Sequence, residues 1–200
     1  MSSNSKLIQL WQSDIVIDYQ NRETLNNQLL PYLLDKYKQT SLGKEHYERI
    51  SHNIFADNFE PVNQLKELLI NTTKNYYDIG GLEFDIEGHE IVSHDRQFIK
   101  THVDTEEGDL TFQYYVKAPK QNEDKETNSF GNASFVLVNP ARPAGSFTFK
   151  NENYLEFPVL PKEGLLIMYR SYIPHYQNPY EGSDELVQVV ANIKFKRELH

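Results

Sequence analysis

Thr101-His102-Val103-Asp104 is the segment on which the expected fold of this chain depends. Residues two apart on an extended strand point to the same side, so His102 and Asp104 can direct an imidazole nitrogen and a carboxylate oxygen toward one cation. One further histidine would complete a set of two histidines and one carboxylate, which suits non-haem Fe(II) with open coordination positions. A His-x-Asp triplet alone is a weak signal, so the third ligand has to come from elsewhere in the chain.

A second segment, far along the chain, offers that histidine. Residues 163–175 read EGLLIMYRSYIPH. The pattern predicts a turn, a buried strand and a bend that presents His175 directly after Pro174. His102, Asp104 and His175 are therefore the predicted metal ligands and catalytic residues. His94 is the best rival ligand, whereas the remaining histidines before it are interpreted as surface or structural residues.

Length and composition limit the classes of protein to consider. The chain has 200 residues and no cysteine, which predicts a single domain (1–200) without disulfides or thiolate-bound metals. The formal net charge of −9 makes nucleic acid an unexpected partner. No stretch approaches the roughly 20 apolar residues of a membrane span, and we expect a soluble, intracellular and cytoplasmic protein.

The first part of the chain, residues 1–81, is expected to be a helical support region. Residues 7–17 read as a short strand pair or an extended edge, and residues 22–38 as a helix with an apolar stripe. Pro31 should kink that helix or split it. A second helix should begin near Pro61 and be stopped by Gly80-Gly81.

Residues 82–197 are expected to form a β core. Short β-rich segments separated by Gly, Pro, Asn or Asp suggest a sandwich or barrel of jelly-roll type. The expected strands are 82–86, 90–92, 97–102, 110–117, 134–138, 146–149, 154–158, 165–169 and 186–195. The predicted fold class is therefore mainly β with N-terminal helices.

These motifs together resemble the Fe(II)/2-oxoglutarate-dependent oxygenase superfamily, and more narrowly its prolyl-hydroxylase-like bacterial and phage branch. That branch carries a His-x-Asp or His-x-His strand, a Tyr-Tyr-aliphatic strand and a Gly-x-Leu run that ends in Ser-x-aliphatic-x-His. The resemblance covers residues 96–195. Its matching residues here are Tyr114, Tyr115, Gly164, Leu165, Ser171, Pro174 and His175, with Tyr169 in the place of a Phe, Arg170 in that of a Pro, and Asn192 as the closing Asn.

The resemblance implies a double-stranded β-helix (jelly-roll or cupin-like) core that holds Fe(II) through His102, Asp104 and His175. It implies 2-oxoglutarate as co-substrate, succinate and CO2 as co-products, hydroxylation of a C–H bond, and ascorbate as a candidate accessory. A protein side chain, prolyl or other, or a small molecule would be the substrate. It also allows a phage-encoded origin.

One departure concerns the far carboxylate of 2-oxoglutarate. The family usually clamps it with an Arg or Lys on the strand after the distal histidine, but residues 184–188 read DELVQ, with Leu186 at the Arg position. A buried carboxylate without a cation is costly. Lys117 is the expected substitute, on the face that Tyr115 would share on a regular strand, and Tyr115 is expected to contact the co-substrate. Arg142, in a turn similar to the family's Asp-Pro-Arg, and Lys194 are the fallback cations.

The missing Arg keeps two other functions open. The chain could be a jelly-roll module that binds or supports a partner without catalysis. It could also be an iron oxygenase that uses a different co-substrate. The sequence does not indicate an oligomeric state.

Overall fold

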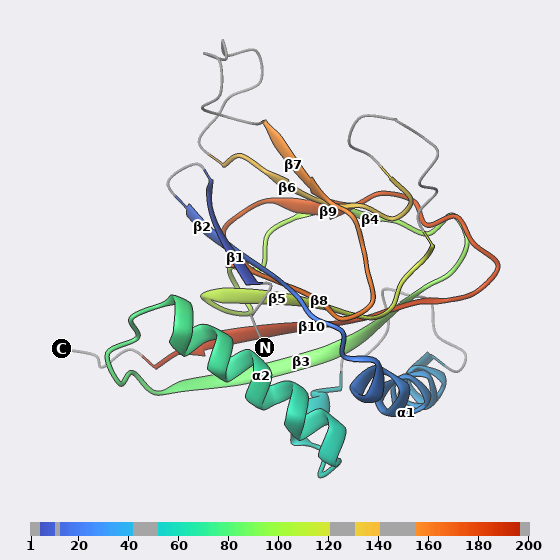
Figure 1. The fold of residues 1–200 in the computed structure, drawn as a ribbon, viewed down its shortest axis with the longest axis horizontal. Coiled ribbons are helices and arrows are strands. Elements are labelled where there is room, and N and C mark those ends of the chain that lie inside the picture. Colours follow the sequence, from blue (N-terminus) through green and yellow to red (C-terminus); the bar gives the residue numbers. More distant parts are fainter. Residues whose placement is uncertain (1–4, 11–12, 42–51, 121–130, 141–154, 197–200) are drawn as a thin grey trace.

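The computed structural model describes residues 5–10, 13–41, 52–120, 131–140 and 155–196 (Figure 1). These residues form two antiparallel β-sheets that face each other, with the helices on the outer side of the larger sheet (Figure 1). The prediction of a mainly β chain with N-terminal helices is confirmed in this form, and the arrangement is jelly-roll-like.

The larger sheet has the strand order β1-β2-β8-β5-β10-β3. Its strands are β1 (Ser5–Leu10), β2 (Ser13–Tyr19), β8 (Leu165–Arg170), β5 (Leu110–Lys117), β10 (Leu186–Phe195) and β3 (Phe84–Ser93). The smaller sheet has the order β4-β9-β6-β7. Its strands are β4 (Ile99–His102), β9 (His175–Gln177), β6 (Phe135–Val138) and β7 (Glu156–Val159).

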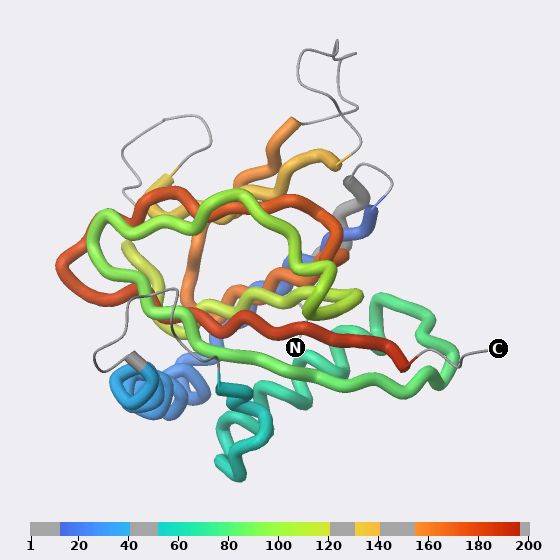
Figure 2. The backbone as a smooth tube through the Cα atoms, turned by 180° about the vertical axis from the view of Figure 1, so that it is seen from behind, coloured from blue at the N-terminus to red at the C-terminus, as the bar shows by residue number. Residues whose placement is uncertain are grey.

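The chain passes repeatedly from one sheet to the other. In Figure 2 the connection from β3 to β4 and the connection from β9 to β10 run side by side at one end of the sandwich. Backbone hydrogen bonds join them, from Arg96 N to Tyr180 O (2.6 Å) and from Tyr180 N to Gln97 O (2.9 Å). These bonds tie β4 and β9, the two strands that carry the predicted histidines, to the same end of the molecule.

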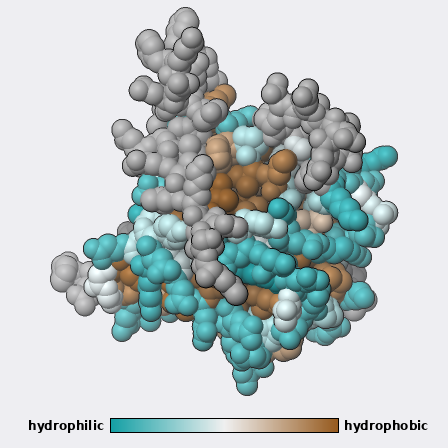
Figure 3. All heavy atoms as spheres, viewed as in Figure 1, coloured by the Kyte–Doolittle hydropathy of each residue, from teal (hydrophilic) through white to brown (hydrophobic). Residues whose placement is uncertain are grey.

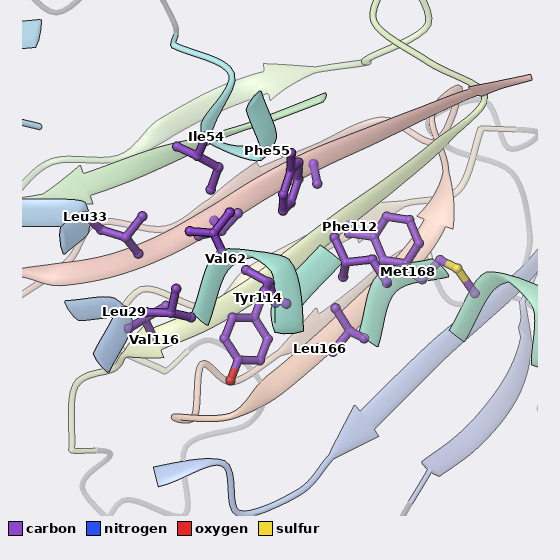
Figure 4. Packing of buried hydrophobic residues seen from close by; sticks show 14 of the residues in the cluster. Leu29, Leu33, Ile54, Phe55, Val62, Phe112, Tyr114, Val116, Leu166 and Met168 are labelled. Carbon is purple, nitrogen blue, oxygen red and sulfur yellow. The ribbon is translucent and has the colours of Figure 1, made fainter. Parts of the chain in front are cut away.

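Helices α1 (Glu23–Ser41) and α2 (Glu60–Tyr76) and a 3₁₀ turn (Ile54–Ala56) cover the outer face of the larger sheet. Apolar side chains from these elements meet apolar side chains from the sheet (Figure 4). We call this the helix-side core. Its fully buried members include Leu29, Leu33, Ile54, Val62, Leu65, Leu110, Phe112, Tyr114, Leu166, Met168, Val187 and Ile193. The apolar stripe predicted for the helix at residues 22–38 is confirmed, because Leu29 and Leu33 lie in this core.

Pro31 does not split α1, which runs as one helix through it. Pro31 is exposed, whereas Leu29 and Leu33 on either side of it are fully buried. A proline inside a helix costs about 3 kcal/mol, and burying a leucine side chain contributes about 1.5–3 kcal/mol. Packing of the two leucines therefore offsets the cost of the proline.

Strand β3 was expected as two strands, but it is continuous through Gly88. A Cβ at Gly88 would lie only 2.5 Å from Cε2 of Phe55, so the glycine allows the 3₁₀ turn to approach the sheet closely. Strand β9 was not expected, because three residues are too few to show a period. The expected strand at 146–149 lies outside the described residues.

Successive residues of β5 and β10 face opposite sides of the larger sheet, as expected for strands. Phe112, Tyr114 and Val116 point into the helix-side core. Thr111, Gln113 and Tyr115 point between the two sheets, which we call the interior. Figure 3 shows hydrophobic side chains both in the interior and between the larger sheet and the helices. Within the described part of the chain, no helix combines the length and the apolar character that a membrane span needs.

Candidate metal centre

The three predicted ligands come together where β4 and β9 pair. His102, the last residue of β4, lies opposite His175, the first residue of β9. Asp104 follows β4 in a turn whose backbone is held by a hydrogen bond from Asp104 N to Ser171 O (2.9 Å). The short sequence spacing between His102 and Asp104 and the strand pairing to His175 thus bring three side chains from two distant segments to one place.

The ligating atoms of His102, Asp104 and His175 all lie within 4.8 Å of one another. Nε2 of His102 is 3.4 Å from Oδ1 of Asp104, and Nε2 of His175 is 3.5 Å from Oδ2 of the same carboxylate. Within the described ranges, no other group of three or more histidine, cysteine or acidic side chains converges in this way. His94 instead lies beside the ring of Tyr37, with 5.9 Å between centroids.

Backbone carbonyls orient both imidazoles. Nδ1 of His102 donates to the Lys100 carbonyl (2.8 Å), and Nδ1 of His175 donates to the Ile173 carbonyl (3.0 Å). A ring that is protonated at Nδ1 presents the lone pair of Nε2, and this is how metal-binding histidines are usually fixed. Both Nε2 atoms face the Asp104 carboxylate, so the three groups present electron pairs to a common point.

Burying the Asp104 carboxylate next to two imidazoles costs free energy unless a cation neutralises its charge. His175 and Asp104 are only 3% and 6% exposed, and Oδ2 of Asp104 is buried without a hydrogen-bond partner. Burial lowers the pKa of His175, against the opposing effect of the Asp104 carboxylate, and so favours the neutral imidazole that binds metals. The residues present therefore fit a divalent metal ion held by two nitrogens and one carboxylate.

Tyr169 gives the site a hydroxyl where the resembling family has a Phe. Its Oη lies 3.2 Å from Nε2 of His175, and its ring is fully buried. Because Nδ1 of His175 carries the proton, the Tyr169 hydroxyl can donate to Nε2 as long as no metal ion takes that lone pair. Burial raises the pKa of Tyr169 well above its usual value, with a further contribution from the Asp104 carboxylate. Tyr169 therefore stays a neutral donor beside the ligating atom.

A cavity of about 170 Å³ in the interior is lined by the three predicted metal-binding side chains, His102, Asp104 and His175. Its other walls come from both sheets and include Gln113, Phe135, Gln177, Val190 and Asn192. A wider cavity of about 420 Å³ shares His89, Glu107 and Asn192 with it. The wider cavity thus lies beside the metal centre, and its walls carry the acidic residues Asp85, Glu87, Glu106 and Glu107.

Three glutamines lie deeper in the interior, and we call them the amide cluster: Gln113 on β5, Gln177 on β9 and Gln188 on β10. Nε2 of Gln113 donates to Oε1 of Gln188 (2.6 Å), and Nε2 of Gln188 donates to Oε1 of Gln177 (2.9 Å). All three are at most 2% exposed. The sequence did not point to this cluster, although a glutamine at an inward position of an otherwise apolar strand is a usable signal.

Tyr115 lies in the interior beside the amide cluster. Its side chain is fully buried, and its Oη has no hydrogen-bond partner. Burial raises the pKa of Tyr115, with a smaller opposing effect from the Gln113 side chain. Leu186, at the position of the family's Arg, is also fully buried and packs in the apolar part of the interior.

Lys117 lies at the end of β5 and is already paired. Its Nζ is 3.4 Å from Oε2 of Glu185 and 3.8 Å from Oδ2 of Asp184. The register with β10 shifts at this point, so that Lys117 lies opposite Val187, a residue of the helix-side core. The regular alternation that would place Lys117 and Tyr115 on one face is therefore interrupted.

The two fallback cations have different positions. Lys194 is exposed and lies on the wider outer cavity. Arg142 lies outside the described residues. Asn192, expected to close the last strand, lines the inner cavity, and its Oδ1 accepts a hydrogen bond from Thr111 (2.9 Å).

No protein-family model matches this sequence, and no curated protein matches it significantly. Solved structures do match its fold. A prolyl-4-hydroxylase from Pseudomonas putida aligns over 92% of this chain and 88% of its own with a TM-score of 0.56 and 16% identity. A viral collagen prolyl hydroxylase from Paramecium bursaria Chlorella virus-1 aligns over 96% and 90%, with a TM-score of 0.53 and 14% identity.

HygX from Streptomyces hygroscopicus, solved with nickel and 2-oxoglutarate bound, aligns over 90% of this chain and 81% of its own. Its TM-score is 0.57 and its identity 9%. The resemblance to the prolyl-hydroxylase-like oxygenases that the motifs indicated is thus confirmed at the level of the fold. Identities this low show the fold alone, so the chemistry has to be argued from the site.

Proposed function

We propose that this protein is an Fe(II)- and 2-oxoglutarate-dependent dioxygenase that hydroxylates a protein side chain or a small molecule. The observation that carries the proposal is the convergence of Nε2 of His102, Nε2 of His175 and the buried, unpartnered carboxylate oxygen of Asp104. When bound there, Fe(II) would supply the oxygen chemistry that no side chain of this chain can provide.

We propose further that strands β3 to β10 form a double-stranded β-helix. Their order is β3-β10-β5-β8 in one sheet and β4-β9-β6-β7 in the other, which is eight antiparallel strands in two facing sheets. In this arrangement β4 and β9 are neighbours at the opening of the barrel. The fold thereby explains why two ligand segments more than seventy residues apart meet at one point.

The residues around the metal have separable roles in this proposal. The carbonyls of Lys100 and Ile173 hold the two imidazoles in the tautomer that presents Nε2. Asp104 supplies the negative charge that a divalent ion needs, and its burial keeps water from competing for it. With the metal bound to Nε2 of His175, the Tyr169 hydroxyl would be free to donate a hydrogen bond to a ligand bound beside the metal.

Co-substrate residues are proposed from the sequence and remain to be tested. Tyr115 is proposed to donate a hydrogen bond to the co-substrate, which fits its unpartnered hydroxyl. The sequence suggests Lys117 as the cation for the far carboxylate, but Lys117 would have to give up Glu185 and Asp184 to reach the ligand, which favours another recipient. Arg142 is the alternative. The nickel and 2-oxoglutarate bound by HygX support a 2-oxo acid in such a fold, and the names of the prolyl hydroxylases support a peptidyl substrate.

The test is a succinate assay. Purified protein with Fe(II), ascorbate and 2-oxoglutarate should form succinate slowly even without a substrate, and the His102→Ala variant should form none. His94→Ala is the matched control, because His94 is exposed and lies outside the cavity. Protein that binds one iron per chain and forms no succinate with 2-oxoglutarate, alone or with candidate peptides, would contradict the proposal.

A further inference from the structure

The interior beyond the metal ligands ends on the amide cluster. Gln177 is two residues after His175 on β9, so both side chains face the interior, about 7 Å apart along the strand. Gln113 and Gln177 line the same cavity as His102, Asp104 and His175. A molecule that binds the metal at one end and extends inward therefore reaches these amides with its other end.

The hydrogen bonds within the cluster leave a donor free. Gln113 donates to Gln188, and Gln188 donates to Gln177, so the chain of bonds ends at Nε2 of Gln177. That nitrogen is buried and has no hydrogen-bond partner, and the same holds for Oη of Tyr115. Buried polar groups are nearly always paired in folded proteins. Since both groups can donate, an oxygen acceptor that enters the interior could satisfy them.

The described residues bring no positive charge to this part of the interior. Among the described residues, no lysine or arginine lines the cavity, whereas Asp104 and Glu107 do. Leu186 fills the position where the family has its Arg, and Lys117 is held by Glu185 and Asp184. A carboxylate placed here would gain hydrogen bonds, but it would lack the charge-assisted pair that normally offsets its burial.

We propose that the far end of the co-substrate lies against the amide cluster and is recognised by uncharged hydrogen-bond donors, chiefly Nε2 of Gln177, in place of the Lys117 that the sequence suggested. The inference rests on the proposed function, because the metal has to anchor the near end. It implies that a 2-oxo acid needs an oxygen acceptor at its far end but gains nothing from a negative charge there. 2-Oxoglutarate would bind, without an advantage over an uncharged analogue of the same shape.

Three 2-oxo acids of nearly equal shape can distinguish the contribution of charge at the far end from the contribution of hydrogen bonding there. 2-Oxoglutarate carries a carboxylate at the far end, 2,5-dioxohexanoate replaces it with a methyl ketone, and 5-methyl-2-oxohexanoate replaces it with an isopropyl group. Binding of each to the Mn(II)-loaded protein is measured by calorimetry without oxygen. We expect the first two to bind within about threefold of each other, and the third about tenfold more weakly, as expected for a lost hydrogen bond.

Variants then show which side chain is responsible for the difference in affinity between these acids. In Gln177→Leu the methyl ketone should lose its advantage over the isopropyl compound, whereas Lys117→Met should leave all three affinities unchanged. Gln64→Leu, on the exposed face of α2, is the matched control. The comparison of the three ligands in the unaltered protein needs no variant, so the test does not depend on how Gln177→Leu folds.

Two results would overturn the inference. A preference of more than about tenfold for 2-oxoglutarate over the methyl ketone would show that a cation receives the far end, Lys117 if Lys117→Met abolishes the preference and another cation if it does not, and the proposed function would stand. Failure of all three acids to bind to protein that holds one Mn(II) per chain would remove the 2-oxo acid from the proposed function as well.

Discussion

Strands β5 and β10 present two faces that differ in chemistry, although successive residues of the same strands alternate between them. Toward the helices the strands present Phe112, Tyr114 and Val189, which pack against the apolar sides of α1 and α2. Toward the interior they present polar side chains such as Gln113 and Gln188, which are just as deeply buried. Packing of apolar side chains stabilises the helix-side core without a ligand. Burying the polar side chains of the interior costs free energy wherever a donor or acceptor has no partner, and a bound ligand can supply that partner.

Particular atoms of the interior carry part of that cost, because they are buried without a hydrogen-bond partner. Oδ2 of Asp104, Oη of Tyr115 and Nε2 of Gln177 all belong to the interior. An apolar core stabilises the fold by excluding water, and it needs no ligand. An interior with aligned electron pairs near the opening and free donors farther in fits the proposed binding of a metal ion and an elongated acid.

The largest effect is expected from Asp104→Ala. Succinate formation should fall at least about a hundredfold, because even residues that only support metal ligands cost 10–100-fold when they are lost. The metal-free variant should be as stable to urea as the unaltered protein, or more stable, since an unpaired buried carboxylate is removed. Asp95→Ala, at an exposed position, is the control. A variant that keeps full activity would show that Asp104 is not a ligand.

Phe112→Ala tests the other face. Phe112 is fully buried in the helix-side core, and its loss should lower the free energy of unfolding by about 3–5 kcal/mol. The folded fraction should still bind one metal ion with unchanged affinity, since Phe112 points away from the interior. Urea unfolding and metal titration of the same sample check both statements. Loss of metal binding by protein that is still folded would mean that the two faces are coupled.

Gln188→Leu should have a smaller effect on stability. The substitution removes the middle of the amide cluster and leaves Gln113 without an acceptor and Gln177 without a donor, at a cost of about 1–3 kcal/mol. Changing Gln113, Gln177 and Gln188 to leucine together should recover much of that loss, because no buried amide is then unpaired. Urea unfolding of the metal-free proteins measures both. A triple variant less stable than the single one would contradict the account of the cluster.

The smallest effect is expected at Asp57, outside both faces. Its carboxylate accepts from the Tyr32 hydroxyl and pairs with Lys36 (2.8 Å) and His52 (3.0 Å). Hydrogen bonding to Lys36, then to Tyr32, lowers the pKa of Asp57 far below its usual value. A lowered carboxyl pKa contributes stability that is present above the unfolded pKa of about 3.9 and is lost as the pH falls below it.

Asp57→Asn should therefore cost about 1 kcal/mol at pH 7, in keeping with a partly exposed ion pair. The difference from the unaltered protein should shrink steadily below pH 4. Urea unfolding at several pH values checks this. A difference that stays constant down to pH 2 would assign the effect to shape rather than to charge.

The sequence predicted the elements that have a clear period and clear ends. The bounds of β5 and β10 agree with the expected 110–117 and 186–195, because long β-rich runs between turn residues leave few alternatives. The predicted ends of β3 and the predicted break in α1 were wrong, because tertiary packing outweighs the local tendency of glycine and proline to interrupt a strand or a helix. Gly88 lies within β3 because Phe55 packs over it, and α1 continues through Pro31 because the leucines beside it are buried.

The candidate metal centre could be predicted because His102 and Asp104 are closely spaced and His175 follows a recognisable apolar run that ends in Pro-His. The amide cluster could not, because Gln113, Gln177 and Gln188 are far apart in sequence and become neighbours only through the strand order. Lys117 illustrates a further limit, since its expected direction assumed a regular strand and the register shifts beside it. Its role in binding the co-substrate stays a prediction.

The central claim is that one metal ion joins His102, Asp104 and His175. The most direct measurement is anomalous X-ray diffraction from a crystal of the full chain soaked with Mn(II). The account predicts one strong anomalous peak at bonding distance from Nε2 of both histidines and from an Asp104 carboxylate oxygen. A crystal that shows no peak there at saturating Mn(II), or a peak bound by other residues, would contradict it.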